Sequence, residues 1–167
     1  MKKVVQLFFI FICFLLQSTL FQSISFAGIV PNLMVMITSA FGFMEGRKDG
    51  MFVGFCCGLL TDIFYSGILG VNALIFLYIG YVNGMANRAF YPDDIKFPIM
   101  LMSMSDLAYL ILTYIFRFLF RARFDVGFYF LHIILPEFIY TTVVAFILYF
   151  PLRAIVMRVE GYRKETE

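Results

Sequence analysis

The chain has few charged residues and a single histidine, and this scarcity excludes most classes of soluble protein. Only 14% of its 167 residues are charged, whereas 62% are hydrophobic and 20% are aromatic, with a mean hydropathy of +0.91. Soluble domains carry about 25% charged residues. The composition therefore predicts an integral membrane protein with room for about six crossings of roughly 20 residues each and little left for a soluble domain.

The sequence also lacks the motifs of common catalytic sites. It contains no nucleophile elbow, phosphate-binding loop, HExxH metal helix or Ser/His/Asp set, so we expect no catalytic residues, no metal and no cofactor. A net charge of +2 does not indicate a nucleic-acid partner. The cysteines Cys13, Cys56 and Cys57 all lie in apolar segments, and we interpret them as packing residues.

Apolar runs separated by polar breaks make up most of the chain. They predict one integral membrane domain over 1–167, folded as an all-α bundle of about six transmembrane segments. The expected segments are 4–26, 31–44, 51–65, 71–86, 97–120 and 128–157. The second, third and fourth are short for a hydrocarbon core of about 30 Å, so tilted or partly re-entrant segments are expected.

The two ends of the chain carry further signals. Lys2, Lys3 and the small residues around Ala27 would also fit a cleavable signal peptide, an alternative to an uncleaved first span. In the last segment we expect Pro136 to introduce a kink, and Pro151 to precede a basic helix on the cytoplasmic surface.

The distribution of basic residues predicts the orientation. With both termini in the cytoplasm, ten of the 13 lysines and arginines lie inside, as the positive-inside rule favours. The three that remain outside are clustered, and they call for an acidic partner, lipid phosphate or a different course of the fifth segment. These three are Arg117, Arg121 and Arg123.

A run of glycines at four-residue spacing is the most informative pattern. In lipid, small residues at this spacing let helix backbones approach closely. The run comprises Gly42, Gly46, Gly50, Gly54 and Gly58. Because the charged stretch 45–49 interrupts it, we expect two packed helices joined by a short polar turn over 45–50.

Asp62 follows the glycine run by one helical turn, at the edge of the glycine face. One interpretation is a ligand or partner contact at the turn that contains Gly67 and Gly70. The alternative, which we favour, is that Asp62 accepts hydrogen bonds from backbone or from Ser66 and so fixes the hairpin to the fourth segment.

Other polar residues lie within the later segments. Asp106 is midway along the fifth segment, on a stripe that includes Arg117, and Glu137 and His132 lie on the sixth. Asp106, Glu137 and His132 would fit a proton relay or cation site. Alternatively, they pair with Arg117, tyrosines and backbone and so lock two helices together. The fourth segment carries a face of small and polar residues, namely Asn72, Gly80, Asn83, Gly84 and Asn87. Hydrogen bonding between helices is the favoured role of its side-chain amides, and ligand binding is the alternative.

The order of these features resembles the rod shape-determining protein MreD family. The matching elements are Gln17-Ser18-Thr19-Leu20, Pro31-Asn32-Leu33, the glycines from Gly46 to Gly58, Gly58-Leu59-Leu60-Thr61-Asp62, Ser66-Gly67, Leu69-Gly70 and Gly80-Tyr81-Val82-Asn83-Gly84. They cover about the first half of the chain. Asn32 departs from the family, which usually has an acidic residue after the proline.

The resemblance implies a non-enzymatic component of the bacterial inner membrane that acts in sidewall peptidoglycan synthesis and cell shape. Its implied partners are MreC above all, with MreB, RodA and a class B penicillin-binding protein. The family is also similar in fold to the substrate-binding subunits of energy-coupling-factor vitamin transporters. The alternative function is therefore a vitamin-binding subunit, with a pocket lined by Asn72, Asp106 and Glu137.

Overall fold

The computed structural model describes residues 2–21, 30–66, 69–87, 96–121 and 130–164, and its regular structure there is entirely helical. The predicted all-α class is therefore confirmed. Two short π-helical turns are continuous with longer helices. In chain order the elements are α1 (Lys2–Leu16), η1 (Gln17–Phe21), α2 (Leu33–Glu45), α3 (Arg47–Tyr65), α4 (Val71–Ala86), α5 (Lys96–Arg121), η3 (Phe130–Ile134) and α7 (Leu135–Lys164).

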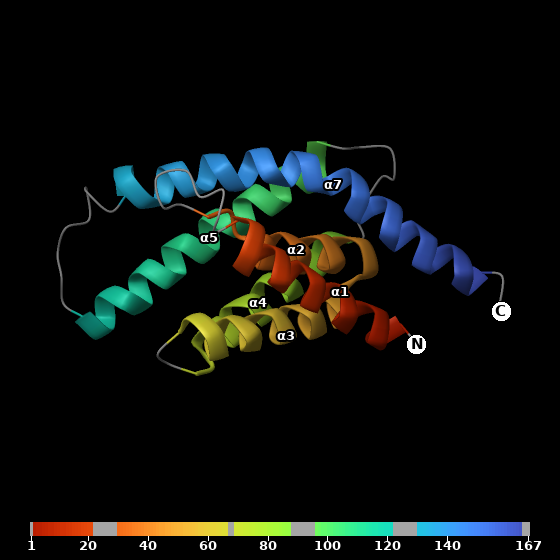
Figure 1. Ribbon diagram of the computed structural model, residues 1–167, viewed down its shortest axis with the longest axis horizontal. Coiled ribbons are helices and arrows are strands. Elements are labelled where there is room, and N and C mark those ends of the chain that lie inside the picture. The colour runs from red at the N-terminus through yellow and green to blue at the C-terminus, as the bar shows by residue number, and fades with distance from the viewer. Residues whose placement is uncertain (1, 22–29, 67–68, 88–95, 122–129, 165–167) are drawn as a thin grey trace.

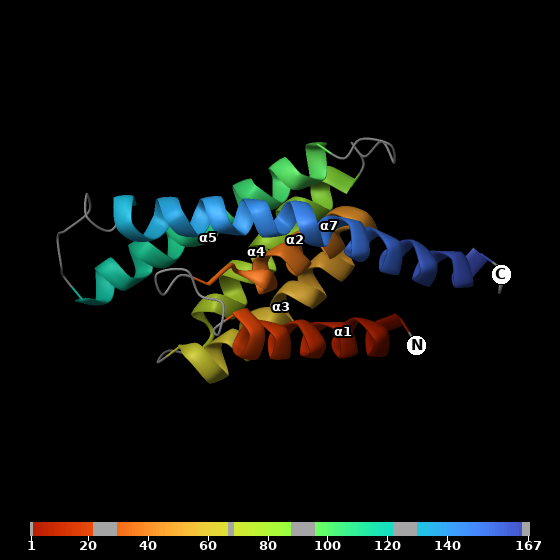
Figure 2. The ribbon, with the colours of Figure 1, turned by 45° about the horizontal axis from the view of Figure 1, so that its top comes forward.

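The helices form a bundle around α2. Every residue of α2 from Leu33 to Phe43 is buried. Helices α3 and α4 pack on one side of it and on each other, which is the most extensive helix contact in the bundle. Helix α1 lies along the outer side of this group, and α5 and α7 run side by side across its other face (Figures 1 and 2).

The elbow between α2 and α3 is shorter than the sequence suggested. Helix α3 begins at Arg47 and not near residue 51, so Gly46 is the one non-helical residue between the two helices. Gly46 has φ +95°, a conformation that side-chain-bearing residues rarely adopt. With 19 residues, α3 is about 28 Å long at 1.5 Å per residue, close to the thickness of a hydrocarbon core. Arg47, Lys48 and Asp49 form the first turn of α3, and their charges are tolerated there because water can solvate the end of the helix.

The prolines of the last segment also differ from expectation. Pro136 lies in the first turn of α7, directly after the π-helical turn η3, so the irregularity precedes the proline. Pro151 does not begin a new helix, because α7 continues through it to Lys164. A proline inside a helix removes one backbone hydrogen bond and favours bending. Helix α7 changes direction along its length (Figure 1).

The outer surface of the bundle is apolar. In the described part of the chain, one stretch, 96–116, is long and apolar enough by itself to cross a membrane, and only 28% of it is buried. Shorter apolar helices span Lys3–Thr19, Leu33–Glu45, Val71–Ala86 and Leu135–Pro151. Exposed apolar side chains follow helical stripes, for example Phe8, Phe11 and Leu15 on α1 and Leu74, Tyr78 and Val82 on α4. Surfaces of this kind contact lipid or other apolar partners.

Candidate functional site

Among the described helices, α3 and α4 pack together most closely. An ideal Cβ on Gly50 would lie 2.5 Å from the carbonyl oxygen of Gly80, and one on Gly58 would lie 2.6 Å from that of Asn72. A Cβ on Gly54 would lie 2.8 Å from the carbonyl carbon of Phe76. Cβ atoms do not approach backbone this closely, so α3 packs here only because these side chains are absent.

Glycines on the neighbouring helices complete this glycine core. A Cβ on Gly42 of α2 would lie 2.8 Å from the Gly80 carbonyl oxygen, and one on Gly84 of α4 would lie 2.6 Å from the amide nitrogen of Arg47. The four-residue series therefore serves two purposes. It lets α2 and α4 both approach α3, and at Gly46 it supplies the positive φ of the elbow. Gly67 lies outside the described residues.

Asp62 anchors one end of the α3–α4 hairpin. Its side chain is 1% exposed. Its carboxylate accepts hydrogen bonds from the backbone N–H of Gly70, Asn72 and Ala73 at 2.9, 3.1 and 2.9 Å, and from Nδ2 of Asn72 at 2.9 Å. These donors belong to the first turn of α4, where backbone N–H groups have no helical acceptor and a negative charge is favoured. Gly70 begins that turn in the left-handed conformation, with φ +100°.

Asn72 also connects the α3–α4 hairpin to α5. Its Oδ1 accepts a hydrogen bond of 3.2 Å from the hydroxyl of Tyr109. The ring of Tyr109 also stacks on Phe76, with centroids 5.0 Å apart and planes 21° apart. Both Nδ2 and Oδ1 of Asn72 therefore have hydrogen-bond partners within the bundle, and the amide is not directed into an open cavity.

Asn83 and Asn87, toward the C-terminal end of α4, connect this helix to its neighbours. Nδ2 of Asn83 donates to Ser105 of α5 at 2.8 Å and to Ser39 of α2 at 3.5 Å. Nδ2 of Asn87 donates to the carbonyl oxygens of Phe43 and Met44, at 2.6 and 3.0 Å, where α2 ends. Helix α4 is thus hydrogen-bonded to α2, α3 and α5 through asparagine side chains.

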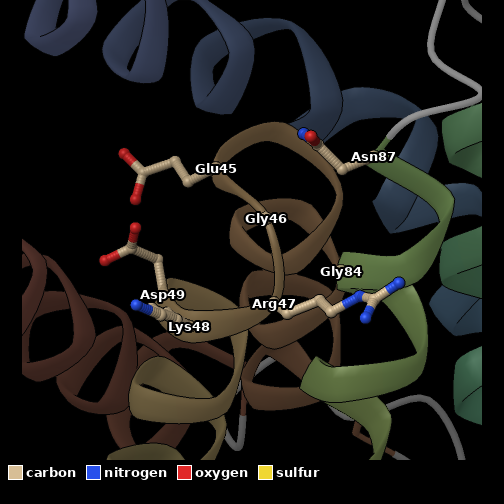
Figure 3. A pocket seen from close by; sticks show the side chains of 7 residues that line it. All are labelled: Glu45, Gly46, Arg47, Lys48, Asp49, Gly84 and Asn87. Carbon is tan, nitrogen blue, oxygen red and sulfur yellow. The ribbon is translucent and has the colours of Figure 1, made fainter.

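A polar pocket of about 330 Å³ lies at the elbow, where α2, α3 and α4 meet (Figure 3). Figure 3 shows the carboxylates of Glu45 and Asp49 directed toward each other on one side, and the side chain of Arg47 extending past Gly84 on the other. The guanidinium of Arg47 lies 5.8 Å from the ring centroid of Tyr81. The pocket is lined by Glu45, Gly46, Arg47, Lys48, Asp49, Gly84 and Asn87.

The two carboxylates at the elbow hold α1. Nζ of Lys3 forms an ion pair of 3.0 Å with Asp49 and lies 3.9 Å from the ring centroid of Phe52. Nε2 of Gln6, which is buried, donates to both Glu45 and Asp49. The sequence reasoning did not single out Gln6, although it is the one polar residue in the apolar run of α1. That isolation was the signal that could have found it.

The polar residues of the later segments do not form one cluster. Asp106 is fully buried between α5 and α7 and interacts with Thr141 and Glu137 of α7. His132 is exposed on η3, so it does not join Asp106 in the interior. Arg117 and Arg121 lie in α5, but their side chains are outside the described part, as are Arg123 and residues 22–29 altogether. No group of three or more metal-ligating side chains occurs among the residues that the structure describes.

A helix bundle with an apolar exterior, a glycine core and only a few buried polar groups is the architecture of a membrane protein. Comparison with known proteins agrees. The model of the family described as rod shape-determining protein MreD matches residues 1–159, and the chain belongs to this family of membrane proteins. No curated protein and no solved structure matches the chain.

Proposed function

We propose that this chain is a non-enzymatic, multi-pass scaffold of the bacterial inner membrane that binds MreC within the elongation complex. In this complex it supports sidewall peptidoglycan synthesis and cell shape, together with MreB, RodA and a class B penicillin-binding protein. The observation that carries the proposal is the family match over residues 1–159.

The distribution of polar and apolar groups supports a scaffold. Several of the described polar side chains of the core are engaged with one another or with backbone, as Asp62 is with Gly70 and Asn83 is with Ser105. The exterior of α1, α4, α5 and α7 remains apolar. A closely packed interior combined with apolar outer stripes suits a protein that presents its surface to the transmembrane helix of a partner.

The positions of basic residues support an orientation with both termini in the cytoplasm. Lys3 reaches Asp49 at the elbow, so the start of α1 and the elbow lie at one end of the bundle. Phe97, in the first turn of α5, lies 5.7 Å from Phe43 at the end of α2, so α5 also begins there. Lys3, Arg47, Lys48 and Lys96 therefore gather at the same end, as a cytoplasmic face requires.

The alternative, a vitamin-binding subunit of an energy-coupling-factor transporter, has less support. Such a subunit needs an outward-facing pocket at the end of the bundle opposite the elbow. The polar pocket of Figure 3 lies at the elbow itself and is not lined by Asn72, Asp106 or Glu137. The amide of Asn72 is occupied by Asp62 and Tyr109.

Co-purification from gently solubilised membranes tests the proposal. A tagged native chain should recover MreC, a single-span protein with a coiled coil. Recovery of an ATPase module with a coupling membrane protein would favour the transporter subunit instead. Gly54→Leu should reduce MreC recovery, because the side chain would separate α3 from α4, while Phe55→Leu on the exposed side of α3 should preserve it. Normal assembly of the Gly54→Leu variant would contradict the proposal.

A further inference from the structure

The acidic and basic sides of the elbow pocket differ in how their charged groups are bonded. On the acidic side, Gln6 of α1 donates hydrogen bonds to both Glu45 and Asp49. On the basic side, Arg47 and Lys48 are exposed, and neither forms a hydrogen bond or an ion pair with any residue that the structure describes. The two cations that line the pocket are therefore free to bind an anion.

The side chain of Arg47 points away from these carboxylates. Figure 3 shows it on the opposite side of the pocket from Glu45 and Asp49, where it extends past Gly84. Its guanidinium lies 5.8 Å from the ring centroid of Tyr81 on α4. A guanidinium presents a planar fork of N–H donors that matches the oxygens of a phosphate group. The basic side of the pocket thus suits a phosphate that lies beside α4.

The size and location of the pocket suit a lipid headgroup. Its volume of about 330 Å³ is at the lower end of the range of about 300 to 1,000 Å³ for ligand sites, so it has room for a headgroup and not for acyl chains. It lies at an end of the bundle, together with Lys3 and the start of α5. Basic pockets between transmembrane helices at the membrane surface bind anionic headgroups.

An apolar stripe on α4 leads from the pocket toward the centre of the bundle. Its exposed side chains recur at successive helical turns, and they are Leu74, Tyr78, Val82 and Met85. From Leu74 to Met85 the helix rises by about 16 Å at 1.5 Å per residue, close to half of a hydrocarbon core of about 30 Å. The acyl chains of one leaflet therefore fit along this stripe while the headgroup lies at the elbow.

We propose that the elbow pocket binds the headgroup of one anionic phospholipid, with its phosphate on Arg47 and Lys48 and its acyl chains along the outer face of α4. An anionic headgroup is preferred to a zwitterionic one because Lys3 and Lys96 lie at the same end of the bundle and add positive charge. The site depends on the location of the elbow at an end of the bundle and not on the protein partners proposed above.

Lipid titration of the purified, delipidated native chain in detergent tests the site. Native mass spectrometry should count one retained phosphatidylglycerol per chain. This lipid should also raise the unfolding midpoint by about 5 to 10 °C when it is in large excess over its dissociation constant. Phosphatidylethanolamine and inorganic phosphate, each at the same concentration, should give much smaller shifts. An equal shift with phosphatidylethanolamine would overturn the preference for an anionic lipid, and an equal shift with inorganic phosphate would overturn the assignment to a lipid.

Two variants and one control locate the response. Arg47→Gln and Lys48→Gln should each reduce the shift with phosphatidylglycerol, and together they should abolish it. Lys96→Gln removes a positive charge at the same end of the bundle but outside the pocket, so it should retain the shift.

Arg47 and Lys48 are exposed, so we expect both variants to fold, and the titration of the native chain is informative without them. The proposal is overturned if phosphatidylglycerol does not shift the midpoint of the native chain. It is also overturned if Lys96→Gln weakens the response as much as Arg47→Gln does, because the attraction would then be diffuse and not located in the pocket.

Discussion

Gly54 of α3 and Phe76 of α4 are in backbone-to-backbone contact, because the carbonyl group of Phe76 occupies the space that a side chain on Gly54 would need. Gly50 and Gly58 have the same relationship to Gly80 and Asn72, one turn to either side. Three consecutive turns of α3 therefore lie directly against the α4 backbone. In a membrane this is a main source of helix affinity, since apolar burial alone does not drive helices together there.

Addition of one methyl group to this contact should destabilise the bundle. We expect Gly54→Ala to lower the free energy of unfolding by about 1 to 3 kcal/mol, the usual cost of overpacking a tight core. The obstructing atoms are backbone, so they cannot move aside as a flexible side chain would. Denaturant titration in detergent micelles measures the change. Phe55→Leu, at a 44% exposed position on the same helix, serves as the control and should change it little.

Asp62 should be more important for the α3–α4 hairpin than any single glycine of the turn. Asp62→Asn presents an amide NH₂ to backbone N–H donors, so the expected loss is about 1.5 to 3 kcal/mol, the range for hydrogen bonds to a charged group. Hydrogen exchange measures it locally. The backbone amides of Gly70, Asn72 and Ala73 should exchange faster in the variant. Unchanged exchange at all three would contradict the assigned anchor, and Tyr65→Phe is the neighbouring control.

The Asn83–Ser105 hydrogen bond should contribute modestly. Hydrogen bonds between membrane helices average about 0.6 kcal/mol in double-mutant cycles, with a maximum near 1.7. We expect a coupling in this range between Asn83→Ala and Ser105→Ala, because Nδ2 of Asn83 lies 2.8 Å from Oγ of Ser105. Unfolding measurements on both single variants and the double variant give the coupling. Strictly additive effects would show that this contact contributes nothing to stability.

The Lys3–Asp49 ion pair should have a small, salt-dependent effect. Lys3 is about half exposed, so we expect Lys3→Met to cost at most about 1 kcal/mol, and less at high salt. Gln6→Leu should cost more, because Gln6 is buried and its loss leaves Glu45 and Asp49 without their shared donor. The rate of disulfide crosslinking between cysteines introduced into α1 and α3 reports the docking of α1. A larger effect of Lys3→Met than of Gln6→Leu would contradict this assignment.

Cysteine labelling in cells tests the orientation. The chain has three free cysteines, Cys13, Cys56 and Cys57, which are first replaced by alanine. A single cysteine at Lys48 should then react only with membrane-permeant maleimide, since the elbow is expected in the cytoplasm. One at Leu69, which is 72% exposed in the turn between α3 and α4, should also react with an impermeant reagent. The reverse labelling pattern would contradict the proposed orientation and show that the elbow lies outside the cytoplasm.

The sequence predicted the helical class and the family because both depend on signals that are local in the chain. Segment 71–86 matches α4, since an apolar run bounded by glycine and polar residues fixes both ends of a helix. The elbow was less predictable. Charged residues inside an apolar pattern suggested a turn over 45–50, whereas Arg47, Lys48 and Asp49 form the first turn of α3. Their location at a helix end, where they can be solvated, is not visible in the order of residues.

Glycine spacing identified α3 as a packing helix without naming its main partner. The turn suggested α2, and the structure shows α4 as the closer neighbour, because Gly50 meets Gly80 and Gly84 meets the Arg47 backbone. Likewise, the sequence indicated that Asp62 and Asp106 both face the protein interior, and it gave no reason to expect different surroundings for the two carboxylates. Only the fold gave Asp62 four donors from the start of α4 and left both oxygens of Asp106 without any.

Composition and spacing thus determined that the chain is helical and apolar outside, since these follow from each residue and its near neighbours. The surroundings of each carboxylate depend on residues distant in sequence, so the tertiary structure alone decided them.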